Sequence, residues 1–316
     1  MIHLLFTGGT ISMQRDQTVG GNLPTHGGEA LVRFAGGLDS ISPYRIENWA
    51  MVPAGHLDQD RLWHLRERIR EIPQSGEVRG IVVTHGTDII EESAYLLDRT
   101  LPGSVPVAIT GAMRTSSDDG WDGPRNLRDA AVVAADGRSA VHGVMVVFNG
   151  KVFTGRHAAK VHATDIDAFA APHAGPIGGV ADGAVVFTTG QGSAARHSLS
   201  PRSLTGRVAL ISMVVGDDGT LLDLARPTHN GVVVIGFGSG NVPPGAVPAL
   251  ERWIDAGKPV VLASRCLYGQ VTPLYAFEGG GRKLIDMGVI PAGPRTPSQA
   301  RMELTIALSA GVQYGS

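Results

Sequence analysis

The sequence predicts an α/β protein with a doubly wound, mostly parallel sheet in a larger N-terminal domain, followed by a smaller α/β C-terminal domain. Two observations predict this fold: short apolar runs recur along the chain, and segments with helical spacing lie between them. The runs are rich in β-branched residues and lack polar alternation, which is typical of parallel strands buried on both faces. They cover residues 2–6, 81–84, 105–110, 144–148, 208–213, 232–237 and 260–263.

The segments between these runs carry apolar residues at helical spacing. We expect helices at residues 60–72, 89–101, 124–135 and 247–256. Alternation of strands and helices implies right-handed crossovers between parallel strands. Ligands of such sheets bind beyond the carboxyl ends of the strands, so the residues that follow each strand are the candidates for a site.

A change in composition divides the chain. Residues 188–206 are rich in Ser, Gly, Thr and Arg and poor in large apolar residues, which is typical of an interdomain linker. We therefore expect an N-terminal domain at residues 1–189, a linker at 190–206 and a C-terminal domain at 207–316. A chain of 316 residues is long enough for two domains, and its 43% of hydrophobic residues can fill both cores.

Charge and composition disfavour several classes of protein. The formal net charge of −2 disfavours nucleic-acid binding, which usually needs a basic surface. The sequence contains no run of about 18 apolar residues, so it predicts no membrane span. The first residues lack the basic start of a signal peptide. A single cysteine, Cys266, excludes an internal disulfide and fits a reducing compartment. We expect a cytoplasmic protein with no membrane or nucleic-acid partner and no metal site, because the 11 histidines are scattered.

The first predicted strand is followed by a motif that places a hydroxyl at the sheet edge. Residues 7–10 read Thr-Gly-Gly-Thr, and the two glycines permit a tight turn and close approach of a ligand. Thr10 would offer its hydroxyl there, although it could instead hydrogen-bond its own backbone in a turn. A dinucleotide loop is disfavoured because the full G-x-G-x-x-G spacing is missing. The glycine- and proline-rich segment 13–28 is either a mobile lid or a surface hairpin.

A second motif, His-Gly-Thr-Asp at residues 85–88, follows the second predicted strand. Thr87 or Asp88 could simply cap the helix that begins there. The functional alternative places both at the same sheet edge as Thr10, where a helix N-terminus favours negative charge on a ligand. Lys160 is either a solvated cation or a buried lysine that assists proton transfer from a hydroxyl nucleophile.

Together these motifs resemble the bacterial L-asparaginase/glutaminase family. The two threonine motifs occur together, and further segments continue the likeness in order along nearly the whole chain. The similar segments are FTGGTIS at 6–12, VVTHGTDIIEESAYLLD at 82–98, TGAMR at 110–114, DGPRNLRDA at 122–130, VVFNGKVFTGRHAAKVHATDIDAF at 146–169, GFGSGNVP at 236–243, SRC at 264–266 and PSQARMEL at 297–304.

The resemblance implies hydrolysis of the side-chain amide of L-asparagine, or of a related small amide, through an acyl-threonine intermediate. Thr10 matches the family's nucleophile. Thr87, Asp88 and Lys160 match a second set, in which Thr87 helps to activate the attacking group or water and Lys160 tunes Thr87. Asp88 would also hold the α-amino group of the substrate. No metal or organic cofactor is needed.

The resemblance also indicates residues around the catalytic set. Backbone amides after Gly8, including that of Gly9, and around Ala112 are candidate oxyanion donors. Sites of the family are completed by the C-terminal domain of a neighbouring subunit. We therefore expect a homodimer or a homotetramer in which Asn241 makes that contribution.

The sequence departs from the family pattern at substrate-binding positions. Gln17 stands where the family commonly has a lid tyrosine. Gly55, His56 and Leu57 match a segment whose Ser-Gln pair binds the substrate α-carboxylate, and leucine has neither donor nor acceptor. These changes bear on the choice of amide more than on the chemistry, and a binding or regulatory protein with little turnover is the alternative. A subunit of a tRNA-dependent amidotransferase is disfavoured because no extra basic domain is present.

Overall fold

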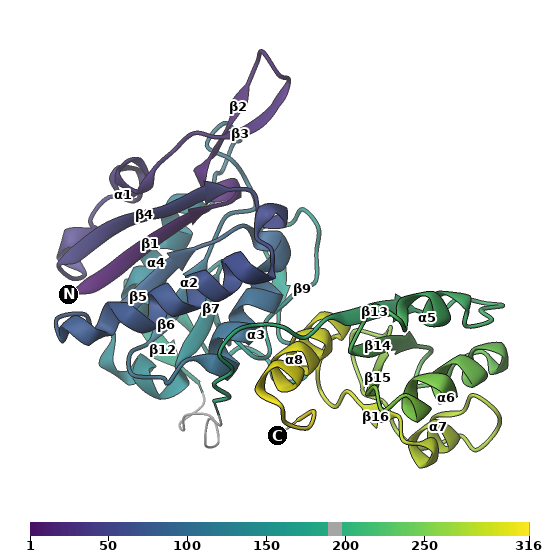
Figure 1. Cartoon of the computed structure of the whole chain (residues 1–316). Coiled ribbons are helices and arrows are strands. Elements are labelled where there is room, and N and C mark those ends of the chain that lie inside the picture. The colour runs from purple at the N-terminus through teal and green to yellow at the C-terminus, as the bar shows by residue number, and fades with distance from the viewer. Residues whose placement is uncertain (189–197, 316) are drawn as a thin grey trace. The chain divides into compact units, whose positions relative to one another are not determined.

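The computed structural model describes residues 1–188 and 198–315. The chain forms two compact units, Met1–Ser198 and Leu199–Ser316. Their boundary falls within the segment predicted as a linker, of which residues 190–197 lie outside the described residues. Each unit contains a sheet covered by helices, and the predicted fold class is confirmed (Figure 1).

The main strands of the larger unit are β1 Ile2–Gly8, β4 Tyr44–Val52, β5 Gly80–Thr84, β6 Val107–Thr110, β7 Val144–Phe148, β8 Lys151–Thr154, β11 Gly178–Ala181 and β12 Ala184–Phe187. They form one sheet in the order β12-β11-β8-β7-β6-β5-β1-β4. The strands from β4 to β7 pair in parallel, and β8, β11 and β12 extend the sheet antiparallel. Neighbouring β1, β5 and β6 therefore end at the same edge.

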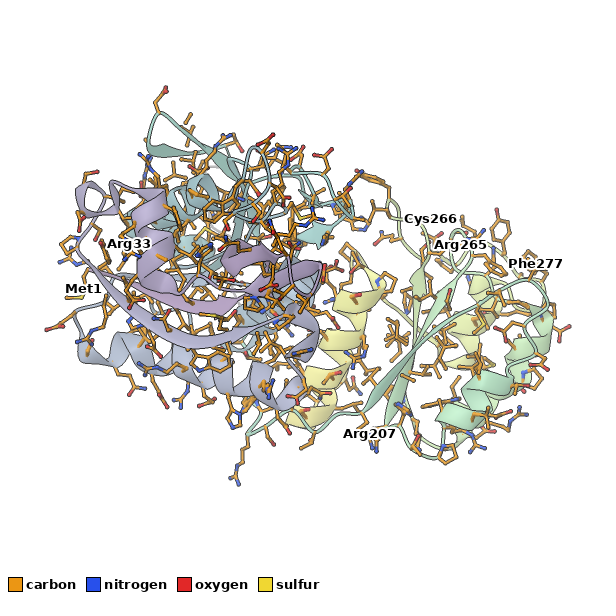
Figure 2. All side chains as sticks on the ribbon, turned by 90° about the horizontal axis from the view of Figure 1, so that it is seen from above. Met1, Arg33, Arg207, Arg265, Cys266 and Phe277 are labelled. Atoms are coloured by element: carbon orange, nitrogen blue, oxygen red, sulfur yellow. The ribbon has the colours of Figure 1, made fainter. Side chains whose placement is uncertain are left out.

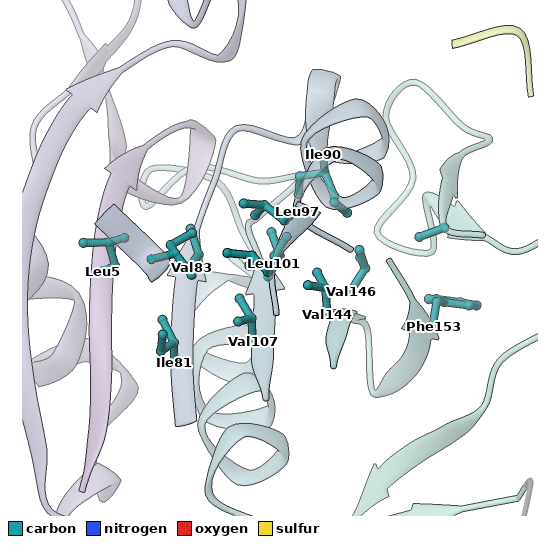
Figure 3. Packing of buried hydrophobic residues seen from close by; sticks show 14 of the residues in the cluster. Leu5, Ile81, Val83, Ile90, Leu97, Leu101, Val107, Val144, Val146 and Phe153 are labelled. Carbon is teal, nitrogen blue, oxygen red and sulfur yellow. The ribbon is translucent and has the colours of Figure 1, made fainter. Parts of the chain in front are cut away.

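The helices packed on this sheet are α1 Gly28–Ala35, α2 Gln59–Glu71, α3 Ile90–Thr100 and α4 Gly123–Ala135. Successive strand residues point to opposite faces, so the unbroken apolar runs fill two cores. Leu5 and Val83 belong to the core under α2 and α3 (Figure 3). Leu4 and Val82 belong to the core under α1 and α4. The covered sheet is thus a rigid support for the loops at its edge.

Shorter elements lie among the loops that follow the strands. They are the 3-10 turns η1 Thr10–Ser12, η3 Ala54–His56 and η5 Thr87–Ile89, the hairpin strands β2 Met13–Asp16 and β3 Gly21–Pro24, and the pair β9 Ala159–Lys160 and β10 Phe169–Ala170. The segment predicted as a lid or a hairpin contains the β2–β3 hairpin, which projects from the larger unit (Figure 1).

The smaller unit contains β13 Val208–Ser212, β14 Gly231–Gly236, β15 Val260–Ser264 and β16 Ile290–Pro291, with helices α5 Thr220–Ala225, α6 Val247–Asp255, α7 Gly281–Met287 and α8 Pro297–Ala310. Its strands pair in parallel in chain order. Trp253 of α6 packs on one face of this sheet and Leu304 of α8 on the other. Cys266 and Phe277 lie at the surface of this unit (Figure 2).

Every strand and helix predicted from an apolar run is present, but other elements were not anticipated. The edge strand β4 has no fully buried residue, and Arg45, Glu47 and Asn48 interrupt its apolar residues, so no apolar run spans it. The antiparallel strands β8, β11 and β12 are each four residues long, too short to give a clear pattern. The apolar pattern thus indicated the central parallel strands and missed the edge strand β4 and the short antiparallel strands.

Candidate active site

The loops after β1, β5 and β6 meet through glycine backbones. A Cβ atom on Gly9 would lie 2.4 Å from the Cα of Gly86. A Cβ atom on Gly111 would lie 2.5 Å from the carbonyl oxygen of His85. Side chains at these positions would force the segments apart, and glycine allows backbone contact. The Thr-Gly-Gly-Thr and His-Gly-Thr-Asp motifs therefore form one continuous rim at the sheet edge.

Thr87, Asp88 and Lys160 are joined by hydrogen bonds. Lys160 Nζ donates to Thr87 Oγ1 at 2.9 Å and to Asp88 Oδ1 at 2.7 Å. The Lys160 side chain is only 16% exposed, so it is not a freely solvated cation. Pairing of Lys160 with Phe169 and a hydrogen bond from Lys160 N–H to Glu91 at 3.4 Å hold the lysine in place. The structure thus brings together three of the residues that the sequence indicated as catalytic.

Thr10 begins η1 directly beyond the two glycines, and its side chain is partly exposed. Gly8 and Gly9 have φ angles of 102° and 84°, which favour glycine and turn the chain toward the rim. Among the described residues, the Thr10 hydroxyl has no hydrogen-bond partner, so it does not bond its own turn. The N–H of Gly9 donates to the carbonyl of Val52 at 3.1 Å. The expectation that this amide serves an oxyanion therefore does not hold for Gly9.

His85 supports the second motif from within the core. The ring is fully buried, with Nδ1 2.9 Å from the Gly86 carbonyl and Nε2 3.1 Å from Ser93 Oγ. The carbonyl can only accept, so Nδ1–H donates to it and Nε2 accepts from the serine. Burial lowers the pKa of His85, which keeps the imidazole neutral. The histidine therefore orients the backbone before Thr87.

Two residues that the sequence did not indicate as part of the site hold the loop after β6. Asp122 accepts hydrogen bonds from the N–H groups of Met113, at 3.0 Å, and Arg114, at 2.9 Å. Asn126 Nδ2 donates to the carbonyl of Gly111 at 3.0 Å. Asn126 is 1% exposed on a helix face that is otherwise apolar. The available signal in the sequence was an asparagine on the otherwise apolar face of the predicted helix 124–135, which does not indicate its role.

Gln17 lies in the exposed turn at the tip of the β2–β3 hairpin. No hydrogen bond within the described part of the chain joins it to Thr10. At the base of the hairpin, Ser116 Oγ donates to the carbonyl of Met13 at 3.1 Å, and His26 Nε2 lies 2.8 Å from the same hydroxyl. The hairpin is thus anchored next to Thr10, and Gln17 occupies its far end.

The predicted carboxylate-binding segment lies beside the second motif. A Cβ atom on Gly86 would lie 2.6 Å from the Cβ of Ala54, the first residue of η3. Gly55 and His56 are exposed, so His56 is open to a ligand. Leu57 is 7% exposed and belongs to the core. Its side chain therefore closes the floor of this segment without offering a polar group.

Asn241 belongs to the smaller unit, and its described contacts lie there. Its Oδ1 accepts from the N–H of Gly281 at 3.3 Å, at the start of α7. Its backbone exchanges hydrogen bonds with Phe237 at 2.7 and 3.0 Å. These contacts fix the loop after β14, and a contribution of Asn241 to a neighbouring subunit stays a prediction.

A groove of about 680 Å³ lies along α4, and the four residues indicated as catalytic do not line it. Ser40, Arg125, Arg128 and Asp129 are among its lining residues. Burial raises the pKa of Asp129, although Arg125 Nε lies 3.7 Å from its carboxylate. The groove has no residue of the glycine-built rim, which carries the residues indicated as catalytic.

Comparison with known proteins shows which family the chain belongs to. The asparaginase N-terminal model matches residues 1–191, and the glutaminase/asparaginase C-terminal domain model matches residues 207–314. Two α/β units with a hydroxyl- and lysine-bearing rim on the first define an asparaginase-type amidohydrolase. The chain belongs to the asparaginase family.

Similar proteins cover nearly the whole chain. The probable L-asparaginase of Deinococcus radiodurans is 36% identical over 312 residues, which are 98% of this chain and 92% of that protein. L-asparaginase 2 of Escherichia coli is 31% identical, over 98% of this chain and 88% of that protein. The crystal structure of the probable cytoplasmic L-asparaginase from Campylobacter jejuni has a TM-score of 0.84 at 28% identity, over 98% of this chain and 94% of that one.

Proposed function

We propose that the chain hydrolyses the side-chain amide of L-asparagine, or of a closely related small amide, through an acyl ester on Thr10. One observation carries the proposal: the Thr10 loop is in backbone contact with the loop of Thr87, whose hydroxyl receives a hydrogen bond from Lys160. A threonine hydroxyl is a weak nucleophile and needs such assistance with its proton. Family membership supplies the reaction class.

The reaction divides into two halves. Thr10 Oγ bonds to the amide carbonyl carbon, and the carbonyl oxygen takes up negative charge beside backbone amides of the rim around Ala112. The carbon–nitrogen bond then breaks, and the nitrogen leaves as ammonia after gaining the proton of the Thr10 hydroxyl. Water next attacks the ester, returns a proton to Thr10 Oγ and releases L-aspartate. In both halves Thr87, with Lys160 behind it, assists the proton transfer.

Substrate recognition would use polar groups around the same rim. Asp88 is 77% exposed beside Lys160 and offers a carboxylate to the α-amino group. His56 offers an imidazole at the position where the family binds the α-carboxylate, and Leu57 adds nothing polar. This combination supports a small amino-acid amide that is bound weakly at its carboxylate.

A substrate panel tests the proposal. Ammonia release is measured with L-asparagine, D-asparagine, L-glutamine and simple β-amides that lack the carboxylate. We expect L-asparagine or a β-amide to be hydrolysed and Thr10→Ala to be inactive on each. A chain that binds L-asparagine but releases no ammonia from any of these amides would instead be a binding protein.

We further propose that the protein forms a homodimer or a homotetramer. In the smaller unit, Val214, Val215, Leu221 and Leu224 are each more than half exposed. A second copy would remove this apolar surface from water, which is favourable. Light scattering at micromolar concentration should give a multiple of the chain mass, and Leu224→Glu should lower it. A monomeric mass with full activity would contradict this.

We propose a cytoplasmic location. Cys266 is exposed and unpaired, which fits a reducing compartment, and the Campylobacter jejuni relative is described as cytoplasmic. No helix in the parts of the chain that the structure describes is long and apolar enough to cross a membrane. Fractionation of cells into periplasmic and cytoplasmic extracts tests the proposal, which fails if the protein leaves with the periplasm.

A further inference from the structure

A hydrogen-bonded pair of side chains, half-buried Asp122 and buried Asn126, lies behind the loop after β6. Asp122 accepts hydrogen bonds from the N–H groups of Met113 and Arg114. Asn126 Nδ2 donates to the Gly111 carbonyl and to Asp122 Oδ2, each at 3.0 Å. Polar groups on both sides of residue 112 are thus held from outside the loop. Such a fully paired, partly buried network fixes one conformation.

Asn126 also reaches a second part of the site. Its Oδ1 accepts from the N–H of Asn149 at 3.1 Å, so both donors and the acceptor of the amide are used. Asn149 begins the turn between β7 and β8 and has a φ of 47°, which is unusual for a residue other than glycine. The chain runs from this turn through β8 to Lys160 in β9. One amide therefore joins the β6 loop to the start of the segment that carries the lysine.

The held loop lies directly against Thr87. A Cβ atom on Gly111 would lie 3.3 Å from Thr87 Cγ2, so the backbone of residue 111 is in contact with the threonine. Ala112, the next residue, is fully buried, so this part of the loop is packed into the protein interior. The hydrogen bonds of Asp122 and Asn126 therefore fix the stretch of backbone that packs beside Thr87.

Helix capping does not account for the pair. Asp122 occupies the N-cap position of α4, yet its side chain makes no hydrogen bond to the helix N-terminus. Aspartate at that position usually accepts from the second or third N–H of the helix. Here the carboxylate is directed at the loop instead, at the expense of the cap.

We propose that Asn126, with Asp122, is a positioning residue that holds residues 111–114 beside Thr87 and ties this loop to the Lys160 segment. The inference rests on the proposed function for its catalytic consequence, and on the hydrogen bonds alone for its structural part. Asn126 itself does not touch the substrate.

The test compares Asn126→Ala with a matched control, Val133→Ala, which removes a buried side chain from the same helix without touching the loop. We expect Asn126→Ala to lower kcat on L-asparagine by about 10- to 100-fold with KM changed less than about threefold, because misplaced catalytic groups cost rate. Val133→Ala should lower the melting temperature and keep kcat within about twofold of the wild type.

Hydrogen–deuterium exchange tests, without any substrate, whether Asn126 holds the loop and the Lys160 segment. Asn126→Ala should speed exchange in peptides that cover residues 111–114 and 149–160, whereas Val133→Ala should not. Asn126→Asp keeps an acceptor for the Asn149 N–H and loses both donors, so it should loosen 111–114 alone.

Unchanged exchange at 111–114 in Asn126→Ala would overturn the inference, and so would an equal loss of kcat in Val133→Ala. A wild-type chain that releases no ammonia would instead refute the proposed function. Exchange at 111–114 would still decide whether Asn126 holds the loop.

Discussion

Thr10 and Thr87 follow neighbouring parallel strands, but their surroundings differ. Thr87 is 4% exposed and receives a hydrogen bond from Lys160 at 2.9 Å. Thr10 is more exposed, and within the described residues its hydroxyl has no hydrogen-bond partner. The fold itself therefore organises the Thr87 hydroxyl, whereas the Thr10 hydroxyl is available to a substrate. This difference is what separate roles for an assisting threonine and a nucleophile require.

The largest effects should come from removing either hydroxyl. Thr10→Ala and Thr87→Ala should each lower ammonia release at least about a thousandfold, because groups that act as a unit fail together. The fold should survive, since neither hydroxyl pairs with a core residue. Circular dichroism and ammonia release measure the two parts, with Thr10→Ser and Thr87→Ser as controls that retain a hydroxyl. Near-normal turnover in either alanine variant would remove that threonine from the account.

Lys160 is the next test, because it distinguishes the two threonines. Lys160→Met removes the hydrogen bonds to Thr87 and Asp88 and should lower kcat by about 10²- to 10⁴-fold, as expected for lost proton-transfer assistance. Lys151→Met is a matched control, since Lys151 pairs with the exposed carboxylate of Asp167 at 2.6 Å. We expect that variant to keep its activity. Equal losses in the two variants would mean that the Lys160 contact is structural.

A smaller effect is expected at the substrate carboxylate. Leu57→Gln should lower the half-saturation concentration for L-asparagine about 10- to 100-fold, because a charge-assisted hydrogen bond contributes roughly 1.5–3 kcal/mol. Leu57 is buried, so thermal unfolding must be followed alongside, and His56→Ser tests the neighbouring donor. A half-saturation that is unchanged or higher in Leu57→Gln would place the carboxylate elsewhere, or would mean that the true substrate lacks it.

The smallest effect concerns the groove along α4, outside the rim. Burial raises the pKa of Asp129, so the folded chain favours the protonated carboxyl, and stability is lost as the pH rises through the folded pKa. Asp129→Asn should raise the free energy of unfolding at neutral pH by up to about 1 kcal/mol. The gain should vanish near about pH 3, where both states are protonated. Melting temperatures at the two pH values measure this, and any loss of activity would contradict a groove without catalytic function.

Much of the fold follows from the sequence because buried parallel strands are continuous apolar runs. The edge strand β4 escaped this reasoning because Glu47 and Asn48 in its middle interrupt its apolar residues. Positions after strands likewise indicated Thr10 and Thr87, since parallel strands end at a common edge, whereas the resemblance to the family indicated the role of Lys160. The role of Asn126 was not predictable, because its partners at 111 and 149 are brought together only by the folded sheet. The hydrogen bond from the N–H of Gly9 to the carbonyl of Val52 was not predictable for the same reason.

The central claim is that Thr10 carries the acyl group. Rapid acid quenching during turnover of L-asparagine, followed by proteolysis and mass spectrometry, tests it most directly. We predict a β-aspartyl ester on the peptide that contains Thr10, absent from Thr10→Ala and accumulated when Lys160→Met slows the attack of water. An ester on the peptide that contains Thr87, with none on Thr10, would contradict the account.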